Sequence, residues 1–484
     1  MCAKSVNTYT KLELCRFRIF FRLFSLTLIA CPSFSSADSH TFQLDSSQGD
    51  LRQVKANLVV KGKLKIKPDG KDQTQSLPLE LKADFFYDEK VVKEGARFRA
   101  VRHYRQAKAD IQVDKNKVAQ RLAEEHQLIV VDASKDGATM FSAIGHLSRD
   151  ELELITVQGS SIFIHSLLPT TPKSVGETWK HDSRAMAALL NLDAITKSDV
   201  ESKLAEVKDG IGLIESVGSI SGAANGVATE LKIKTKCNFD FRLKQITGFA
   251  MAVQEERSET VAEPGFEVIA QLRLAMRPID ESPYLSDQIL ADISLESKPE
   301  NSLLRYDSTS GAFGFLHEPG WHVMLDRENV TVLRLVDDGD FVGQCNVSRL
   351  SDLAEGKHLS LEEFQADVQK SLADSFGQFV DASQATTKGG LRILRVAVAG
   401  TASNVPIHWI YYHLANDNGR RVSCVFTMQS KLMERFGSAD SVVVSSLQVR
   451  ERPASDDSKS PTPAAAARQA DATNKNPTPS TRSN

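Results

Sequence analysis

The chain has 484 residues, which is too long for one ordinary hydrophobic core, and a typical domain of roughly 150 residues predicts two or three folding units. Its composition of 41% hydrophobic and 25% charged residues is ordinary for a soluble globular protein. The formal net charge of −3 excludes the strongly basic balance of a general nucleic-acid-binding protein, so no nucleic-acid partner is expected.

The N-terminus has the order of a secretory signal, in which basic residues precede a short apolar run at residues 23–30. That run is about half of the ~20 residues needed to cross a bilayer, so no transmembrane span is expected in the mature protein. The small residues 35–37 predict cleavage after Ala37, which makes residues 1–37 a signal peptide. Residues 28–31 also resemble a bacterial lipobox, in which Cys31 would be lipidated, and both alternatives stay open. We expect an exported protein that is periplasmic or associated with the cell envelope.

Residues 38–280 are predicted to form a mostly antiparallel β domain with a few helices. Apolar residues alternate with polar ones at 54–66 and again at 77–87, around a turn at 68–70, which predicts a long hairpin. Further strands are expected at 100–113, 128–132, 138–142 and 161–165. Ser148 and Glu151 form a capping-box pattern that predicts a short helix through Ile155.

The second half of this domain is predicted to contain a helix followed by long strands. Helical spacing covers residues 183–204, with Ser198 as an expected N-cap. Strands are expected at 210–223, 228–243, 248–257 and 267–276. The pair Asn225-Gly226 between the first two is the most specific hairpin signal.

Residues 281–302, rich in Asp, Ser, Glu and Pro, are interpreted as a linker to a second domain at 303–450. The expected order there is a strand at 311–315, a turn at 318–321, two strands at 331–336 and 341–350, a helix capped by Ser360, a meander at 391–399, 406–414 and 421–428, and a closing helix at 430–447. The tail 451–484 lacks aromatic residues and is expected to be disordered.

This order, with Phe313-Gly314-Phe315, Pro319-Gly320-Trp321 and Ser445-Ser446-Leu447 as its most suggestive motifs, resembles the PsbP/Mog-type α/β sandwich. The resemblance implies a fold, and members of that fold are mostly small binding or assembly-assisting modules without catalysis. Residues 40–280 resemble conserved exported bacterial proteins of unknown function, mainly in the stretch 167–179. That second resemblance implies no activity.

Three cysteines follow the signal. Cys345 and Cys424 fall in two predicted strands of one domain, and an exported compartment permits a disulfide between them. The alternative is that both are buried free thiols, because a domain of this size does not need a disulfide for its stability. Cys237 has no evident partner.

The densest polar feature of the chain is a group of four arginines on one predicted strand: Arg97, Arg99, Arg102 and Arg105. Together such guanidinium groups could hold an anionic polymer or a lipid headgroup. The alternative is a solvated strand face balanced by Asp84, Asp88 and Glu89. No catalytic, cofactor-binding or metal-binding residues are predicted, and no cofactor is expected.

The function that these features favour is that of an exported, non-catalytic envelope protein that binds a protein or a lipid-like partner. One alternative is an exported, hydrolase-like enzyme whose residues converge only in three dimensions. Another is a carrier of an apolar ligand, which would need a large apolar cavity.

Overall fold

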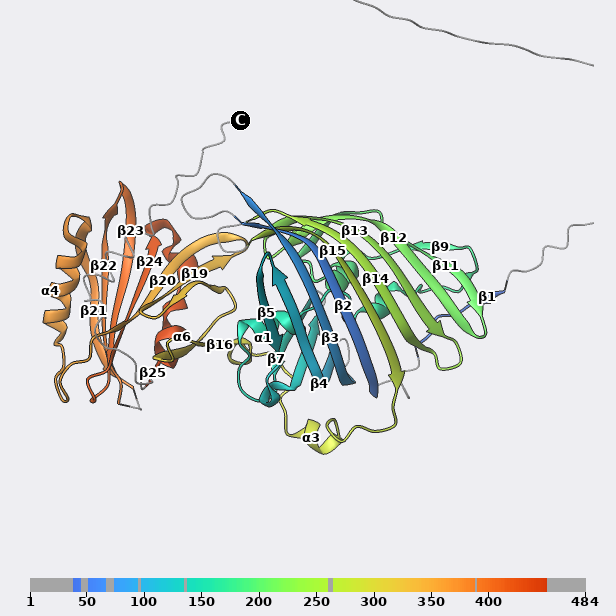
Figure 1. Cartoon of the computed structure of the whole chain (residues 1–484), viewed down its shortest axis with the longest axis horizontal. Helices are drawn as coiled ribbons and strands as arrows, with labels where there is room; N and C mark the ends of the chain where they lie inside the picture. Colours follow the sequence, from blue (N-terminus) through green and yellow to red (C-terminus); the bar gives the residue numbers. More distant parts are fainter. Residues whose placement is uncertain are drawn as a thin grey trace, which may run out of the picture. The chain divides into compact units, whose positions relative to one another are not determined.

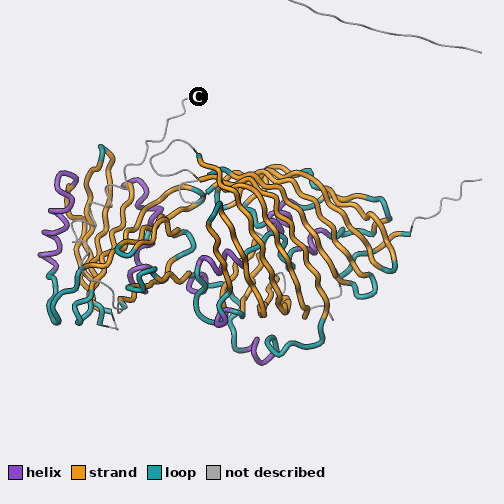
Figure 2. Tube along the Cα trace, in the orientation of Figure 1, coloured by secondary structure: helices purple, strands orange, loops and turns teal. Residues whose placement is uncertain are grey.

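The computed structural model describes residues 38–44, 51–66, 74–94, 97–134, 137–259, 264–387 and 390–450. The predicted signal, the lipidation residue Cys31 and the predicted disordered tail lie outside these residues. Strands dominate, with a few short helices between them (Figures 1 and 2). The fold is therefore β-rich with several sheets, and α+β in class.

Residues 51–278 contribute one large antiparallel sheet in which thirteen strands are described. The neighbour order is β7-β6-β4-β3-β2-β15-β14-β13-β12-β11-β9, with β5 paired to β4 and β10 paired to β12 (Figure 1). The strand bounds are β2 Leu51–Ile66, β3 Gln75–Glu94, β4 Arg97–Val113, β5 Asn116–Arg121, β6 Leu128–Ser134, β7 Gly137–Ser142, β9 Thr178–Lys180, β10 Ala194–Ser198, β11 Glu201–Lys208, β12 Ile211–Ala224, β13 Val227–Asp240, β14 Gln245–Arg257 and β15 Gly265–Pro278. The predicted long hairpin and the Asn225-Gly226 turn are confirmed.

The alternation in the sequence gives this sheet two different faces. We call the face that carries Val54, Tyr87 and Met251, all buried, the inner face. The opposite, outer face carries exposed lysines such as Lys61 and Lys234. Residues that lie directly opposite each other on neighbouring strands point to the same face, so each row across the sheet is either inner or outer.

A segment of short helices and loops packs on part of the inner face. It contains α1 (Arg149–Ile155), the 3₁₀ helix η2 (Ile164–Leu167) and α2 (Ser183–Leu190). Its apolar side chains join those of the sheet in one core; they include Leu154, Ile162 and Leu189. The capping box of α1 is present as predicted, with the Ser148 hydroxyl accepting from the Glu151 amide.

Three predictions for residues 161–204 are wrong. Residues 161–165 do not form a strand but a turn and the start of η2. Their side chains Ile162 and Ile164 are buried in the core, but the backbone of this segment does not pair with a strand. The helix predicted at 183–204 ends at Leu190, where Asn191 adopts a left-handed φ of 53°. Its N-cap is Asp182, and Ser198 instead ends strand β10.

The segment interpreted as a linker contains the helix α3 (Asp287–Ala291) and the 3₁₀ helix η3 (Pro299–Ser302). It also makes contacts with the large sheet. The Ser282 hydroxyl donates to Asp88, the Tyr284 ring stacks on His103 at a centroid distance of 3.8 Å, and the Ser297 amide donates to Asp132. The proposed domain boundaries at 280 and 303 stay a prediction.

Residues 304–449 contribute a seven-stranded sheet in the order β18-β19-β20-β24-β23-β22-β21 and a small sheet of β16, β17 and β25. The bounds are β16 Leu304–Asp307, β17 Phe313–His317, β18 Trp321–Arg327, β19 Val330–Asp337, β20 Asp340–Leu350, β21 Phe376–Thr386, β22 Arg392–Ala402, β23 Val405–Ala415, β24 Arg421–Gln429 and β25 Gln448–Val449. A further short pair, β1 (Ser39–His40) with β8 (Lys173–Ser174), forms a separate two-stranded sheet.

Helices pack on both faces of the seven-stranded sheet. The helix α4 (Leu361–Leu372), capped by Ser360 as predicted, shares a core with Trp409 and Tyr411. The other face, with Ile410 and Tyr412, packs on α5 (Met433–Phe436) and α6 (Ala439–Ser446). The closing helix predicted at 430–447 is interrupted because Gly437 takes a positive φ of 56°, and β21 was not predicted.

Candidate functional site

Three of the four predicted arginines lie on β4 next to acids, of which Asp88 and Glu89 are buried and Asp132 is partly buried. Arg102 is 2% exposed and Arg99 5% exposed, so the prediction of a solvated strand face does not describe these two. A β-bulge places Arg105 between residues that pair with β3, since Phe86 lies opposite Gln106 and Tyr87 lies opposite Tyr104. The side chain of Arg97 is outside the described part.

Glu89 is the centre of a row of charges on the inner face. Arg52 on β2 and Arg102 on β4 lie directly opposite Glu89 on its two neighbouring strands. Arg52 Nε and Arg102 Nε each donate to a Glu89 carboxylate oxygen at 2.7 Å, and the Ser161 hydroxyl donates at 2.8 Å. Glu89 itself is 0% exposed, so a fully buried carboxylate is held by two guanidinium groups.

Burial alone would raise the pKa of Glu89. The positive charges of Arg52 and Arg102, with the hydrogen bonds from Arg102 and Ser161, outweigh burial and lower this pKa to about 2. Burial raises the pKa of Tyr87 and of Tyr104 beside the cluster. At neutral pH Glu89 is therefore ionised and the two phenols keep their protons.

The next acid, Asp88, points to the outer face because neighbouring strand residues alternate. It accepts from Arg105 Nη2 at 2.6 Å, from the Ser282 hydroxyl at 2.7 Å and from Gln53 Nε2 at 3.3 Å. Burial acts to raise the pKa of Asp88, but these hydrogen bonds lower it overall. Arginines of β4 thus form ion pairs with β3 on both faces of the sheet, with Glu89 on the inner face and with Asp88 on the outer face.

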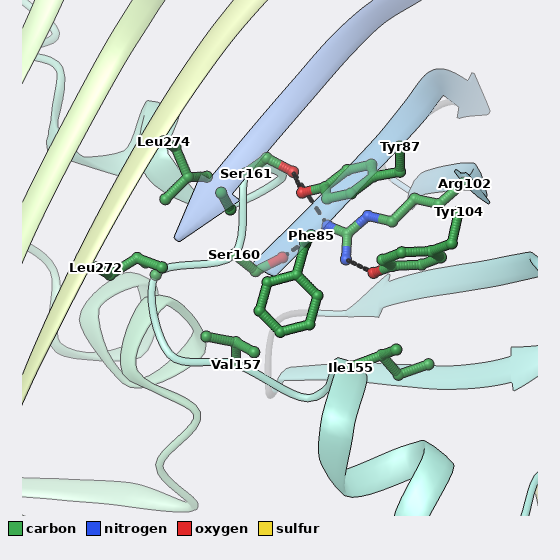
Figure 3. A pocket seen from close by; sticks show the side chains of 12 residues that line it. Phe85, Tyr87, Arg102, Tyr104, Ile155, Val157, Ser160, Ser161, Leu272 and Leu274 are labelled. Atoms are coloured by element: carbon green, nitrogen blue, oxygen red, sulfur yellow. Dashed lines mark hydrogen bonds between the residues drawn. The ribbon is translucent and has the colours of Figure 1, made fainter. Parts of the chain in front are cut away.

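A cavity of about 30 Å³ adjoins the Glu89 cluster, and Figure 3 shows its lining. Arg102 Nη2 reaches the hydroxyls of Ser160 at 2.8 Å and Ser161 at 3.1 Å, and Arg102 Nη1 donates to the Tyr104 hydroxyl at 3.3 Å. The rest of the lining includes Phe85, Ile155, Val157, Leu272 and Leu274. This volume is enough for one or two water molecules and far below the ~300 Å³ or more of a small-molecule site.

The Glu89 cluster is therefore suited to holding the sheet together. Its carboxylate already accepts from three side chains, two of which are the guanidinium groups of Arg52 and Arg102. A general base needs a pKa near the working pH, and Glu89 lies far below it. Of the arginines that the sequence singled out, Arg102 pairs with Glu89, Arg105 with Asp88 and Arg99 with Asp132.

The three cysteines among the described residues form no disulfide. Cys237, Cys345 and Cys424 are free and buried. Cys345 lies opposite Phe426, and Cys424 lies opposite Val347, so the two thiols are diagonal neighbours on β20 and β24. Diagonal positions are ~7–8 Å apart, beyond the Cβ separation of about 4 Å in a disulfide.

Sequence reasoning missed an apolar patch on the inner face, where β15, β2, β3, β4 and β5 lie side by side. It consists of side chains that are half-buried or exposed and lie outside the core cluster: Val60, Leu64, Leu77, Leu79, Val113, Val118 and Phe266. Register places them together, because Leu64 lies opposite both Phe266 and Leu77. The alternation was visible in the sequence, but it cannot tell which inner-face residues the core covers.

Among the described residues, no group of three or more His, Cys, Asp or Glu side chains is placed to hold a metal ion. Within the same residues, no helix combines the length and the apolar character needed to cross a membrane.

Comparison with known proteins gives no family. No family model matches the chain, and no curated protein matches it. Among solved structures, cyanobacterial PsbP from Synechocystis is 21% identical, with a TM-score of 0.25 over 31% of this chain and 93% of that chain. The Ran-binding protein Mog1p of Saccharomyces cerevisiae is 12% identical, with a TM-score of 0.24 over 30% and 95%.

Two other solved structures are matched over less than half of their length. A lipovitellin structure is 8% identical, with a TM-score of 0.28 over 51% of this chain and 26% of that chain. A protein from Bacteroides thetaiotaomicron is 14% identical, with a TM-score of 0.23 over 30% and 48%. PsbP and Mog1p are the proteins to which the sequence resemblance pointed, but at TM-scores below 0.5 none of these similarities establishes a shared function.

Proposed function

We propose that this protein is an exported, non-catalytic binding protein that takes a lipid-like ligand on the apolar patch of its large sheet. The observation that carries the proposal is a contiguous set of apolar side chains on the inner face that the core leaves partly uncovered. Contiguous apolar surface of this kind marks binding sites in soluble proteins. Export and an envelope location rest on the sequence of the N-terminus.

The patch is large enough to matter energetically. Each methylene group removed from water contributes ~0.8 kcal/mol, so ten methylenes resting on the patch would contribute about 8 kcal/mol. The loss of translational and rotational freedom on association reduces this free energy by several kcal/mol. Because a micromolar dissociation constant corresponds to about 8 kcal/mol, the apolar contact of ten methylenes alone gives binding weaker than micromolar.

A lipid-like ligand fits the site better than a catalytic role does. The patch supplies apolar contact without a nucleophile or base among its members. The cluster of charged side chains around Glu89 lies in a different row of the sheet, away from the patch, and Glu89 accepts from both of its arginines. The binding of an apolar molecule needs neither a nucleophile nor a base.

The test is the binding of the fluorescent apolar probe N-phenyl-1-naphthylamine to the purified full chain. We expect saturable binding, and at least tenfold weaker binding in the double variant Leu64→Gln/Leu79→Gln. The matched control is Ile269→Gln, because Ile269 is 52% exposed on the outer face of the same sheet and its loss should leave binding unchanged. Equal binding by both variants, with folding verified by circular dichroism, would refute the proposal.

A further inference from the structure

Arg257 at the end of β14 borders the apolar patch. It lies directly opposite Phe266, and its guanidinium carbon is 4.7 Å from the centre of that ring. The row continues across the sheet through Leu64 and Leu77. Arg257 therefore lies on the inner face, in the same row as three members of the patch.

The guanidinium of Arg257 is only partly used. Its side chain is 12% exposed, and Nη2 donates to Glu255 at 2.6 Å. Its Nε is buried and has no hydrogen-bond partner among the described residues. A buried donor without a partner costs free energy, and buried polar groups in native proteins are normally satisfied, so this one points to a missing acceptor.

Glu255 is held in place by other donors. Gln158 Nε2 donates to one of its oxygens at 2.9 Å, and the Thr229 hydroxyl donates to the other at 3.0 Å. With its two oxygens engaged in this way, the carboxylate is not free to turn toward Arg257 Nε. An acceptor for that nitrogen has to come from elsewhere.

We infer that the ligand of the patch is a long-chain fatty acid whose carboxylate accepts from Arg257 and whose acyl chain lies on the patch. This inference rests on the proposed function and gives it a ligand class. Arginine is always charged and presents its donors in a fork that matches a carboxylate. A neutral apolar ligand would leave the buried Nε of Arg257 unsatisfied.

The dimensions agree with one acyl chain. From Val60 to Leu64 the patch extends roughly 13 Å along β2, at ~3.3 Å per residue. Across the five strands from β15 to β5 it extends roughly 19 Å, at ~4.8 Å per strand. The hydrocarbon core of a bilayer, two acyl chains deep, measures ~30 Å, so one chain measures about 15 Å and fits on the patch.

The experiment compares palmitate with hexadecanol, which has the same chain length but no charge, by displacement of the naphthylamine probe from the full chain. We expect palmitate to bind at least tenfold tighter than hexadecanol. Arg257→Gln should abolish this preference while leaving hexadecanol binding unchanged. The matched control is Arg273→Gln, an exposed arginine on the outer face of β15, which should keep the preference.

A second variant keeps the inference testable if Arg257→Gln does not fold. Glu255→Gln removes the competing carboxylate and should tighten palmitate binding severalfold without changing hexadecanol binding. Equal binding of palmitate and hexadecanol to the native chain overturns the fatty-acid inference and leaves the proposed function standing. Failure of both molecules and of the probe to bind overturns the proposed function itself.

Discussion

Replacement of Glu89 by Gln is the sharpest test of the buried charge row. The substitution removes the negative charge and leaves Arg52 and Arg102 facing a neutral amide in the core. The pKa of Glu89 falls from its ordinary 4.5 to about 2 in the folded protein, and this difference of about 2.5 units corresponds to about 3 kcal/mol at 1.36 kcal/mol per unit. Breaking a buried ion pair by removing one partner costs ~3–5 kcal/mol, in agreement.

The pH dependence of this contribution follows from the direction of the shift. Because folding lowers the pKa of Glu89, the stabilisation is fully present above about pH 4.5 and is lost as the pH falls toward about 2. The difference in stability between the native chain and Glu89→Gln should therefore be constant near neutral pH and shrink in acid.

Hydrogen exchange followed by mass spectrometry is the suitable assay, since it reports on β3 and β4 separately from the rest of the chain. A loss of about 3 kcal/mol predicts roughly hundredfold faster exchange of the protected amides in these strands at pH 7. Glu80→Gln is the matched control, because Glu80 lies on the same strand and pairs with Lys61 and Lys82 on the exposed outer face. Unchanged protection in Glu89→Gln at pH 7 would refute the reasoning.

Three further outcomes are expected. The thiols of Cys345 and Cys424, whose pKa values burial raises, should react with a maleimide only after unfolding, and rapid labelling of the native chain would contradict their burial. Tyr284→Ala removes the ring that stacks on His103, so limited proteolysis should cut within residues 281–302 faster; an unchanged rate would mean that other contacts hold this segment. Gly210→Ala forces a side chain into a left-handed turn with φ of 78° and should cost ~1–2 kcal/mol in urea unfolding, and a neutral effect would show that the turn relaxes.

Part of the fold could be predicted because it depends on local pattern. The alternation at 54–66 and 77–87 fixes period-two strands, and Asn225-Gly226 supplies the positive φ that a two-residue hairpin needs, with φ values of 51° and 72°. The helix cap at Ser148 could be predicted for the same reason, since its hydrogen bonds join Ser148 and Glu151, which are three residues apart in the sequence. Predictions of secondary structure were wrong where the conformation depends on contacts with residues far away in the sequence. Residues 161–165 have the composition of a strand, but they cover the core without pairing along a strand.

The sequence by itself determined most of the long strands, the two faces of those strands and the abundance of arginine on β4. Only the tertiary structure decided which strands are neighbours, and with them which charges meet. Arg52 and Glu89 are 37 residues apart along the chain, and they meet because β2 and β3 pair in one register. The apolar patch and Arg257 belong to the same class of feature, since exposure depends on what packs above a residue and alternation along one strand carries no information about it.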